Sequence, residues 1–184
     1  MVTLTIKLPT QEKQTAFNLR RWSQLHTDPL IVQELAKLEG RVETDRHGHI
    51  IVYPLAGVSH GGYQSEIACL LRTLLPAGRI TIGCPISTAD GVKGADVVWV
   101  SRPRMAATNR ENCLTAAPEI CVEVLSPDNS RREMEEKKVL YFTAGAREVW
   151  MCDRDGVMVF FTSAASRGQK TSKLSPKFPR QIQF

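Results

Sequence analysis

Two acidic residues stand where β-strands are expected, and their surroundings make both of them candidates for chemistry. Glu123 lies within the apolar stretch ICVEVLSP, residues 120–127, and Asp96 follows GA at the start of DVVWV. A run this apolar is typical of a strand that is covered on both faces. A buried carboxylate is costly unless a partner compensates its charge. The identity of that partner therefore bears directly on function.

A divalent metal ion is one candidate partner. If the two strands are neighbours, Asp96 and Glu123 can point to the same end of one sheet face. Carboxylates about 4–6 Å apart repel each other unless a cation lies between them. Hard oxygen ligands favour Mg²⁺ or Mn²⁺, and the backbone carbonyl of Val124 is a further candidate ligand. The alternative is a structural salt bridge between Glu123 and an arginine or lysine, and spacing alone does not separate the two.

The segments around these acids predict an α/β (α+β) fold. Helices are expected over residues 10–25, 28–40 (ending at Gly40), 60–78 and 130–145, a hairpin over 41–55, and strands over 78–87, 94–101, 119–126, 147–153 and 157–161. Ser130 and Glu133 form a capping box that opens the last helix. A strand, a helix and a further strand make a βαβ unit, so the strand of Glu123 is expected to run parallel to residues 147–153. The sheet is therefore expected to be mixed, central and flanked by helices.

The chain resembles a known family at this point. GADVVWVS, followed by PEICVEVLSPDNSRREMEEKKVLYFTAGAREVWMCD, is similar to the Uma family of "putative restriction endonucleases", formerly a domain of unknown function. That family belongs to the PD-(D/E)-x-K nuclease superfamily. The resemblance covers roughly residues 41–161, because RVETDRHGHIIVYPLAGVSHGGYQSEI also resembles the family's N-terminal hairpin and first core helix. It implies a restriction-endonuclease-like core with N-terminal helices and a hairpin.

The resemblance also implies roles for individual residues. Asp96 matches the acid of the PD element, although the preceding residue here is alanine. Glu123 matches the second metal-binding acid. Glu66 matches an acid on the first core helix that often completes the metal site. The predicted metal ligands are thus Asp96, Glu123, Glu66 and the carbonyl of Val124.

The lysine of the superfamily pattern is displaced in this sequence. Leu125 stands where the strand lysine would be, whereas Lys137 on the capped helix matches the place where Uma-like proteins commonly carry one. A lysine there would orient the attacking water and offset the developing phosphate charge. Lys138 is the rival candidate. The plainer alternative is that Lys137 only pairs with Glu133 across one helical turn.

Together these features predict a Mg²⁺- or Mn²⁺-dependent endonuclease that hydrolyses DNA phosphodiester bonds, with Asp96, Glu123, Lys137 and Glu66 as its catalytic residues. The alternative is a nuclease-like module that has lost cleavage and binds DNA or a protein partner. Folds of this kind often cut duplexes as two subunits, so a homodimer is a candidate assembly. At 184 residues one domain is expected: a helical segment 1–40, a core 41–161 and a basic tail 162–184.

Composition bears on the class of partner, on the role of the cysteines and on the cellular location. The net charge of +5 is compatible with a polyanionic partner. The five cysteines have irregular spacing and no C-x-x-C pair, so they indicate core residues rather than disulfides or a zinc site. No apolar run approaches the ~18 residues of a membrane span, and the first residues do not resemble a signal peptide. A cytoplasmic location and no membrane partner are the expectation.

Overall fold

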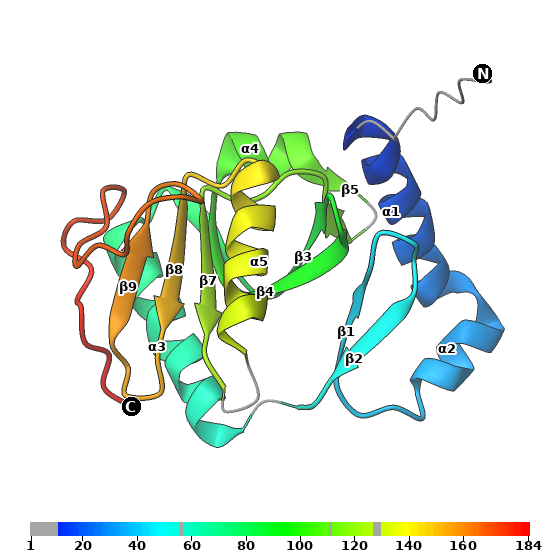
Figure 1. Ribbon diagram of the computed structural model, residues 1–184, viewed down its shortest axis with the longest axis horizontal. Helices are drawn as coiled ribbons and strands as arrows, with labels where there is room; N and C mark the ends of the chain where they lie inside the picture. The colour runs from blue at the N-terminus through cyan, green and yellow to red at the C-terminus, as the bar shows by residue number, and fades with distance from the viewer. Residues whose placement is uncertain (1–10, 56, 111, 127–129) are drawn as a thin grey trace, which may run out of the picture.

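The computed structural model describes residues 11–55, 57–110, 112–126 and 130–184. In this part of the chain, seven strands form one sheet of order β5-β6-β3-β4-β7-β8-β9 (Figure 1). The strands are β3 (Gly78–Thr88), β4 (Gly91–Ser101), β5 (Asn109–Arg110), β6 (Cys113–Leu114), β7 (Ile120–Val124), β8 (Glu148–Cys152) and β9 (Met158–Phe161). Both parallel and antiparallel neighbours occur, so the predicted mixed sheet is confirmed.

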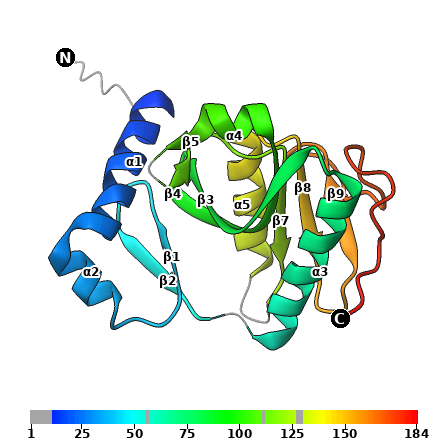
Figure 2. The ribbon, with the colours of Figure 1, turned by 180° about the vertical axis from the view of Figure 1, so that it is seen from behind.

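Helices cover both faces of this sheet. Helix α5 (Arg131–Thr143) crosses the face that is turned to the viewer in Figure 1, and α3 (Val58–Leu74) crosses the opposite face, which Figure 2 shows from behind. Helix α4 (Arg102–Thr108) lies at one end of the strands. The helices α1 (Gln11–Thr27) and α2 (Pro29–Leu35), with the hairpin of β1 (Arg41–Thr44) and β2 (Ile50–Tyr53), stand to one side. The predicted α+β architecture is confirmed.

The βαβ unit around Glu123 forms as predicted. The hydroxyl of Ser130 accepts a hydrogen bond from the backbone N–H of Glu133, which caps α5, and Gly145 follows the helix with φ 104°. Strands β7 and β8 are parallel. An apolar cluster that includes Cys121, Val149 and Tyr141 packs α5 onto the sheet. Burial of this helix face fixes which α5 side chains reach the strand of Glu123.

The hairpin of β3 and β4 is longer than the sequence predicts. The two strands pair down to Thr88 and Gly91, so the turn has two residues instead of the seven of TADGVKG. Gly91 has φ 83°, a conformation that favours glycine and that ends a tight hairpin turn. The expectation that Asp96 begins its strand is therefore wrong. Asp96 lies in the middle of β4, directly before Val97, which pairs with Ile82 of β3 and with Val122 of β7.

Helix α2 is shorter than predicted. Asp28 caps it as expected, accepting hydrogen bonds from the N–H groups of Leu30 and Ile31, and Pro29 occupies its first turn. The helix ends at Leu35 rather than at Gly40, whose φ of 149° leads into β1. No residue of α2 is buried, so little packing energy favours a longer helix.

The segment after β9 contributes to the core. Phe178 and Ile182 pack among buried residues such as Trp150, and buried Glu148 accepts hydrogen bonds from the N–H groups of Lys173 and Leu174. Cys84, Cys113, Cys121 and Cys152 are buried and free, as predicted, while Cys69 is exposed. Among the described helices, none is long and apolar enough to cross a membrane.

Candidate active site

Asp96 and Glu123 face each other across neighbouring strands. Strands β4 and β7 are antiparallel, with Val97 opposite Val122. Asp96 directly precedes Val97 and Glu123 directly follows Val122, so the two acids lie side by side at the same end of this pairing, where the N–H of Val124 donates to Asp96. Both side chains are almost completely buried, with exposed fractions of 2% and 3%. The predicted proximity of the two acids is therefore a feature of the sheet itself.

Cationic and N–H groups surround the carboxylate of Asp96. Its Oδ1 accepts a hydrogen bond from the guanidinium of Arg41 at 2.7 Å, and its Oδ2 accepts one from the N–H of Val124 at 2.7 Å. The Nε2 of His60 lies 3.4 Å from Oδ2. Burial alone would raise the pKa of Asp96, but the contacts with His60 and the charge of Arg41 outweigh burial, so this pKa is lowered. Asp96 is ionised at neutral pH.

Glu123 lies in a different electrostatic environment. The hydroxyl of Tyr141 donates a hydrogen bond of 2.6 Å to its Oε1, and the Nζ of Lys137 is 3.5 Å from its Oε2. Burial raises the pKa of Glu123, Lys137 lowers it, and repulsion from Asp96 raises it again, to about 7. Near neutral pH Asp96 is thus negatively charged, whereas the ionisation of Glu123 depends on nearby cations.

The two neighbouring lysines of α5 point to different places. Lys137 is buried, and its Nζ donates to Oε1 of Glu43 at 2.9 Å as well as approaching Glu123. Burial lowers the pKa of Lys137, but attraction to Glu123 and Glu43 outweighs burial, so this pKa is raised. Lys138 instead pairs with Glu135 at 2.6 Å and lies over the ring of Phe161. Lys137 is therefore the lysine that faces the acids, and it is a cation.

Glu43 of the N-terminal hairpin is a third acid at this site, and sequence reasoning missed it. Its side chain has no exposed surface, and its Oε1 accepts hydrogen bonds from Lys137 and from the N–H of Gly94. Arg41 lies 3.3 Å from the same oxygen. The other oxygen, Oε2, is buried without a hydrogen-bond partner. In RVETD, Glu43 alternates with Val42 in a short hairpin strand, a pattern that normally indicates an exposed residue, so no local signal identifies it.

The hairpin also supplies an aromatic surface beneath both cations. The guanidinium carbon of Arg41 and the Nζ of Lys137 each lie 5.5 Å from the centre of the Tyr53 ring, on β2. Cations over an aromatic face are attracted to its electrons. Burial and the charge of Glu43 raise the pKa of Tyr53 to about 12, so its ring stays neutral.

The remaining predicted ligands occupy less direct positions. Glu66 lies on α3, and its side chain is exposed; among the described contacts it has none with Asp96 or Glu123. Its role stays a prediction. The N–H of Val124 is used by Asp96, which leaves the predicted role to its carbonyl. His60, one turn before Gln64 on α3, contacts Asp96, and its Nδ1 is buried without a hydrogen-bond partner.

Acidic and cationic side chains alternate at the site, so the acids do not form a group of their own. In the described residues, no three His, Cys, Asp or Glu side chains gather in a group that could hold a metal ion. The reason is that Arg41 lies between Asp96 and Glu43, and Lys137 lies between Glu43 and Glu123. Arg41 has a side chain that is 32% exposed, so it is the cation that solvent reaches.

The solved structures include one with a similar fold. A crystal structure described as a putative nuclease belonging to DUF820, from Anabaena variabilis, is 19% identical to this chain with a TM-score of 0.60. The alignment covers 74% of this chain and 81% of the other. No curated protein matches the chain. At this identity the likeness concerns the fold, and it confirms the predicted nuclease-like core.

The family comparison covers most of the sequence. The pattern of the Uma2 family, described as "putative restriction endonuclease", matches residues 22–179. This range contains the hairpin with Glu43, both strand acids and α5 with Lys137. It also extends well beyond residues 41–161, where the sequence alone shows the resemblance. The chain belongs to the Uma2 family of restriction-endonuclease-like proteins.

Proposed function

We propose that this protein is a divalent-metal-dependent endonuclease that hydrolyses DNA phosphodiester bonds at the Asp96–Glu123 pair. The observation that carries the proposal is a set of three buried carboxylates, those of Asp96, Glu43 and Glu123, which are linked through the cations of Arg41 and Lys137. Buried charges of this number are costly for stability, and perturbed pKa values of this kind cluster at functional sites. Membership of the Uma2 family supports a nuclease, and DNA is the substrate that this implies.

The acids would form a magnesium or manganese site only if Arg41 moved aside, because with Arg41 in place no metal-binding group is present among the described residues. Asp96 and Glu123 would hold the ion, with the carbonyl of Val124 as a further ligand. The buried Oε2 of Glu43 lacks a partner and is the orphaned acceptor that such an ion would satisfy. A bound divalent ion supplies an activated water and offsets negative charge on the phosphate. Oxygen ligands of this type favour Mg²⁺ or Mn²⁺ over softer metals.

Each protein group at the site then has a distinct task. Lys137 keeps its positive charge at Nζ, so it orients water and stabilises charge instead of accepting a proton. Tyr141 donates to Oε1 of Glu123 and so leaves Oε2 of that carboxylate for a cation. The raised pKa of Glu123 falls when a cation binds, because positive charge favours the ionised acid.

Arg41 is the internal cation that a metal would replace at Asp96. It binds Oδ1 of Asp96 and approaches Glu43, so it occupies the position between two of the acids. Its partial exposure permits the side chain to swing toward solvent. If an ion were held by these acids, Arg41 would be displaced from them, and its guanidinium would be available to contact a phosphate.

The experiment is cleavage of supercoiled plasmid by the purified protein with Mg²⁺, with Mn²⁺ and with EDTA. We expect nicked and linear products only with a divalent ion, and none from Asp96→Asn. A protein that cuts neither plasmid nor linear duplex with either ion would contradict the proposal.

One alternative has an observation in its favour. Arg41 and Lys137 already neutralise much of the acidic charge, which suits a nuclease-like module that binds DNA or a protein without cutting. Such a module would bind a duplex equally well in EDTA and in Mn²⁺, and its melting temperature would not respond to the metal. The proposed nuclease should show a metal-dependent rise in melting temperature, because a ligand that binds only the native state stabilises it.

A further inference from the structure

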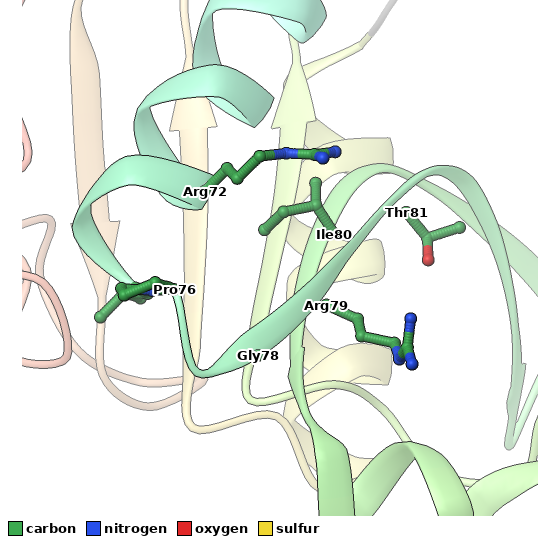
Figure 3. Close-up of a pocket in the computed structure, with 7 residues that line it drawn as sticks. Arg72, Pro76, Gly78, Arg79, Ile80 and Thr81 are labelled. Carbon is green, nitrogen blue, oxygen red and sulfur yellow. The ribbon is translucent and has the colours of Figure 1, made fainter.

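Two arginines line one hollow at the end of α3. This hollow, the arginine pocket, is formed by Arg72, Arg79, Leu75, Pro76, Ile80 and Thr81 together with Gly78, and has a volume of about 440 Å³. Figure 3 shows the side chains of Arg72, from α3, and Arg79, from β3, extending in the same direction beside Ile80 and Thr81. The pocket lies outside the site formed by Asp96 and Glu123.

A rigid turn holds the two arginines together. Helix α3 ends at Leu74, and the carbonyl of its C-cap residue, Leu75, accepts a hydrogen bond of 2.8 Å from the indole N–H of Trp99. Gly78 begins β3, and a Cβ there would lie 2.3 Å from the Trp99 ring, so only glycine fits. Arg72 in the last helical turn and Arg79 in the second strand position are thus set on either side of a fixed bend.

Neither arginine has an acidic partner. Both side chains are exposed, and neither forms an ion pair with any residue in the described part of the chain. The position of Arg72 alone would be explained by its favourable interaction with the negative C-terminal end of α3. The position of Arg79 alone would be explained by the charged residues that commonly protect an exposed strand edge from pairing with another chain. Neither reason explains why both cations line the same hollow. An anion bound there would offset both positive charges.

The surrounding surface has the same sign of charge. Ser101 pairs with Gly78 at this end of the sheet, so Arg102 directly follows there, and Arg147 precedes the start of β8 at the same end. Figures 1 and 2 place the end of α3, the start of α4 and the end of α5 together on this side. The acid Glu119 is already bound by Arg104 and Ser101. The local field therefore favours a polyanion.

We propose that Arg72 and Arg79 bind a backbone phosphate of the DNA duplex at some distance from the cleaved bond. This inference rests on the proposed function, since it assigns a second contact for the same substrate. In the register of β3 and β4, Gly83 falls opposite Asp96, between the pairs Ile82–Val97 and Cys84–Ala95. Arg79 is four residues away, at most about 13 Å along the strand at roughly 3.3 Å per residue. One strand of duplex spans this length in about four steps of 3.4 Å.

The experiment is a titration of a fluorescein-labelled 20-base-pair duplex in EDTA, followed by anisotropy between 50 and 250 mM salt. We compare wild type, the double variant Arg72→Ala/Arg79→Ala, and single Arg20→Ala as a control with an exposed arginine on α1. Each phosphate contact contributes about 0.9 to the slope of log affinity against log salt. Because the two arginines share one phosphate, the double variant should lose about 0.9 from that slope and bind roughly 5-fold more weakly near 150 mM salt. Arg20→Ala should change the salt slope and the affinity only slightly.

Plasmid cleavage separates this inference from the proposed function. If the nuclease is real and the pocket holds DNA, the double variant should raise KM and leave kcat unchanged. Unchanged affinity in the double variant, or an equal loss in Arg20→Ala, would overturn the arginine pocket while cleavage still stands. Absence of cleavage in wild type would overturn the proposed function alone, provided that the duplex still binds through Arg72 and Arg79. A melting temperature equal to that of wild type confirms that the double variant is folded.

Discussion

Lys137 connects the last helix of the core to the N-terminal hairpin, because its Nζ lies 2.9 Å from Oε1 of Glu43. The two residues are 94 positions apart in the chain, and both are buried. The same Nζ lies 3.5 Å from Glu123 on β7. One lysine thus joins three elements around the acids. The predictions below separate its chemical role from its structural one.

Replacing Lys137 with alanine should reduce plasmid cleavage by two or more orders of magnitude, roughly the loss caused by removing one preorganised charge-stabilising group. DNA affinity should change little. The variant also leaves buried acids uncompensated, at about 3–5 kcal/mol, so cleavage is measured well below its melting temperature. Lys138→Ala is the matched control, since neighbouring helix positions point about 100° apart. Equal activity loss in both variants would argue against a specific role for Lys137.

Arg41→Gln should lower the thermal stability of the metal-free protein but increase its stabilisation by Mn²⁺. The change removes the cation bound to Oδ1 of Asp96 and so leaves this carboxylate free for Mn²⁺. We expect a lower melting temperature in EDTA and a larger rise on titration with Mn²⁺ than in wild type. Arg46→Gln, at an exposed pair with Asp90 beside the same hairpin, is the control. An identical Mn²⁺ response in wild type and Arg41→Gln would show that Arg41 does not compete with the metal.

Asp96→Asn should lower the metal-free melting temperature. The structure pairs Asp96 with Arg41, with the N–H of Val124 and with His60, so its charge is favourable. If Asp96 and Glu123 were instead two unpaired negative charges, Asp96→Asn would raise the melting temperature. Differential scanning calorimetry in EDTA decides between them, and the variant should also lose any stabilisation by Mn²⁺. A higher melting temperature in EDTA would show that repulsion from Glu123 dominates.

The pH dependence of stability should report Glu123. The pKa of this acid is about 7 in the folded protein against an ordinary value of 4.5, so the folded state binds more protons between these values. Stability therefore falls as pH rises from about 4.5 to about 7. In EDTA, the melting temperature of wild type relative to Glu123→Gln should fall between pH 5 and pH 8. A constant difference across this range would mean that Glu123 ionises normally.

Two further substitutions test whether Glu43 or Glu66 is the third acid that acts with Asp96 and Glu123. Glu43→Gln should abolish both cleavage and stabilisation by Mn²⁺, because the residue is buried against Lys137 and has an unsatisfied oxygen. Glu66→Gln should retain both, because its side chain is exposed. Cleavage and thermal shift with Mn²⁺ measure the two effects. Loss of activity in Glu66→Gln with a normal melting temperature would restore the role implied by the resemblance.

The sequence by itself determined the elements whose signals are local. The capping box at Ser130, the apolar run around Glu123 and the following strand predict the βαβ unit, and the structure contains it. The sequence predicts Asp96 and Glu123 to be close only if their strands are neighbours, which the structure shows them to be. The position of Lys137 on α5 follows from the helical period once the buried face of the helix is known.

Only the tertiary structure decided which other charges join these acids. Glu43 and Arg41 lie in a short hairpin whose alternation gives no sign that its polar face is covered by β4 and α5. Helical period could not choose between Lys137 and Lys138, since that requires the packing of α5 on the sheet. The exposure of Glu66 depends likewise on how α3 is rotated over the strands. Long-range packing sets these contacts, and in a single sequence the residues that make them stand far apart.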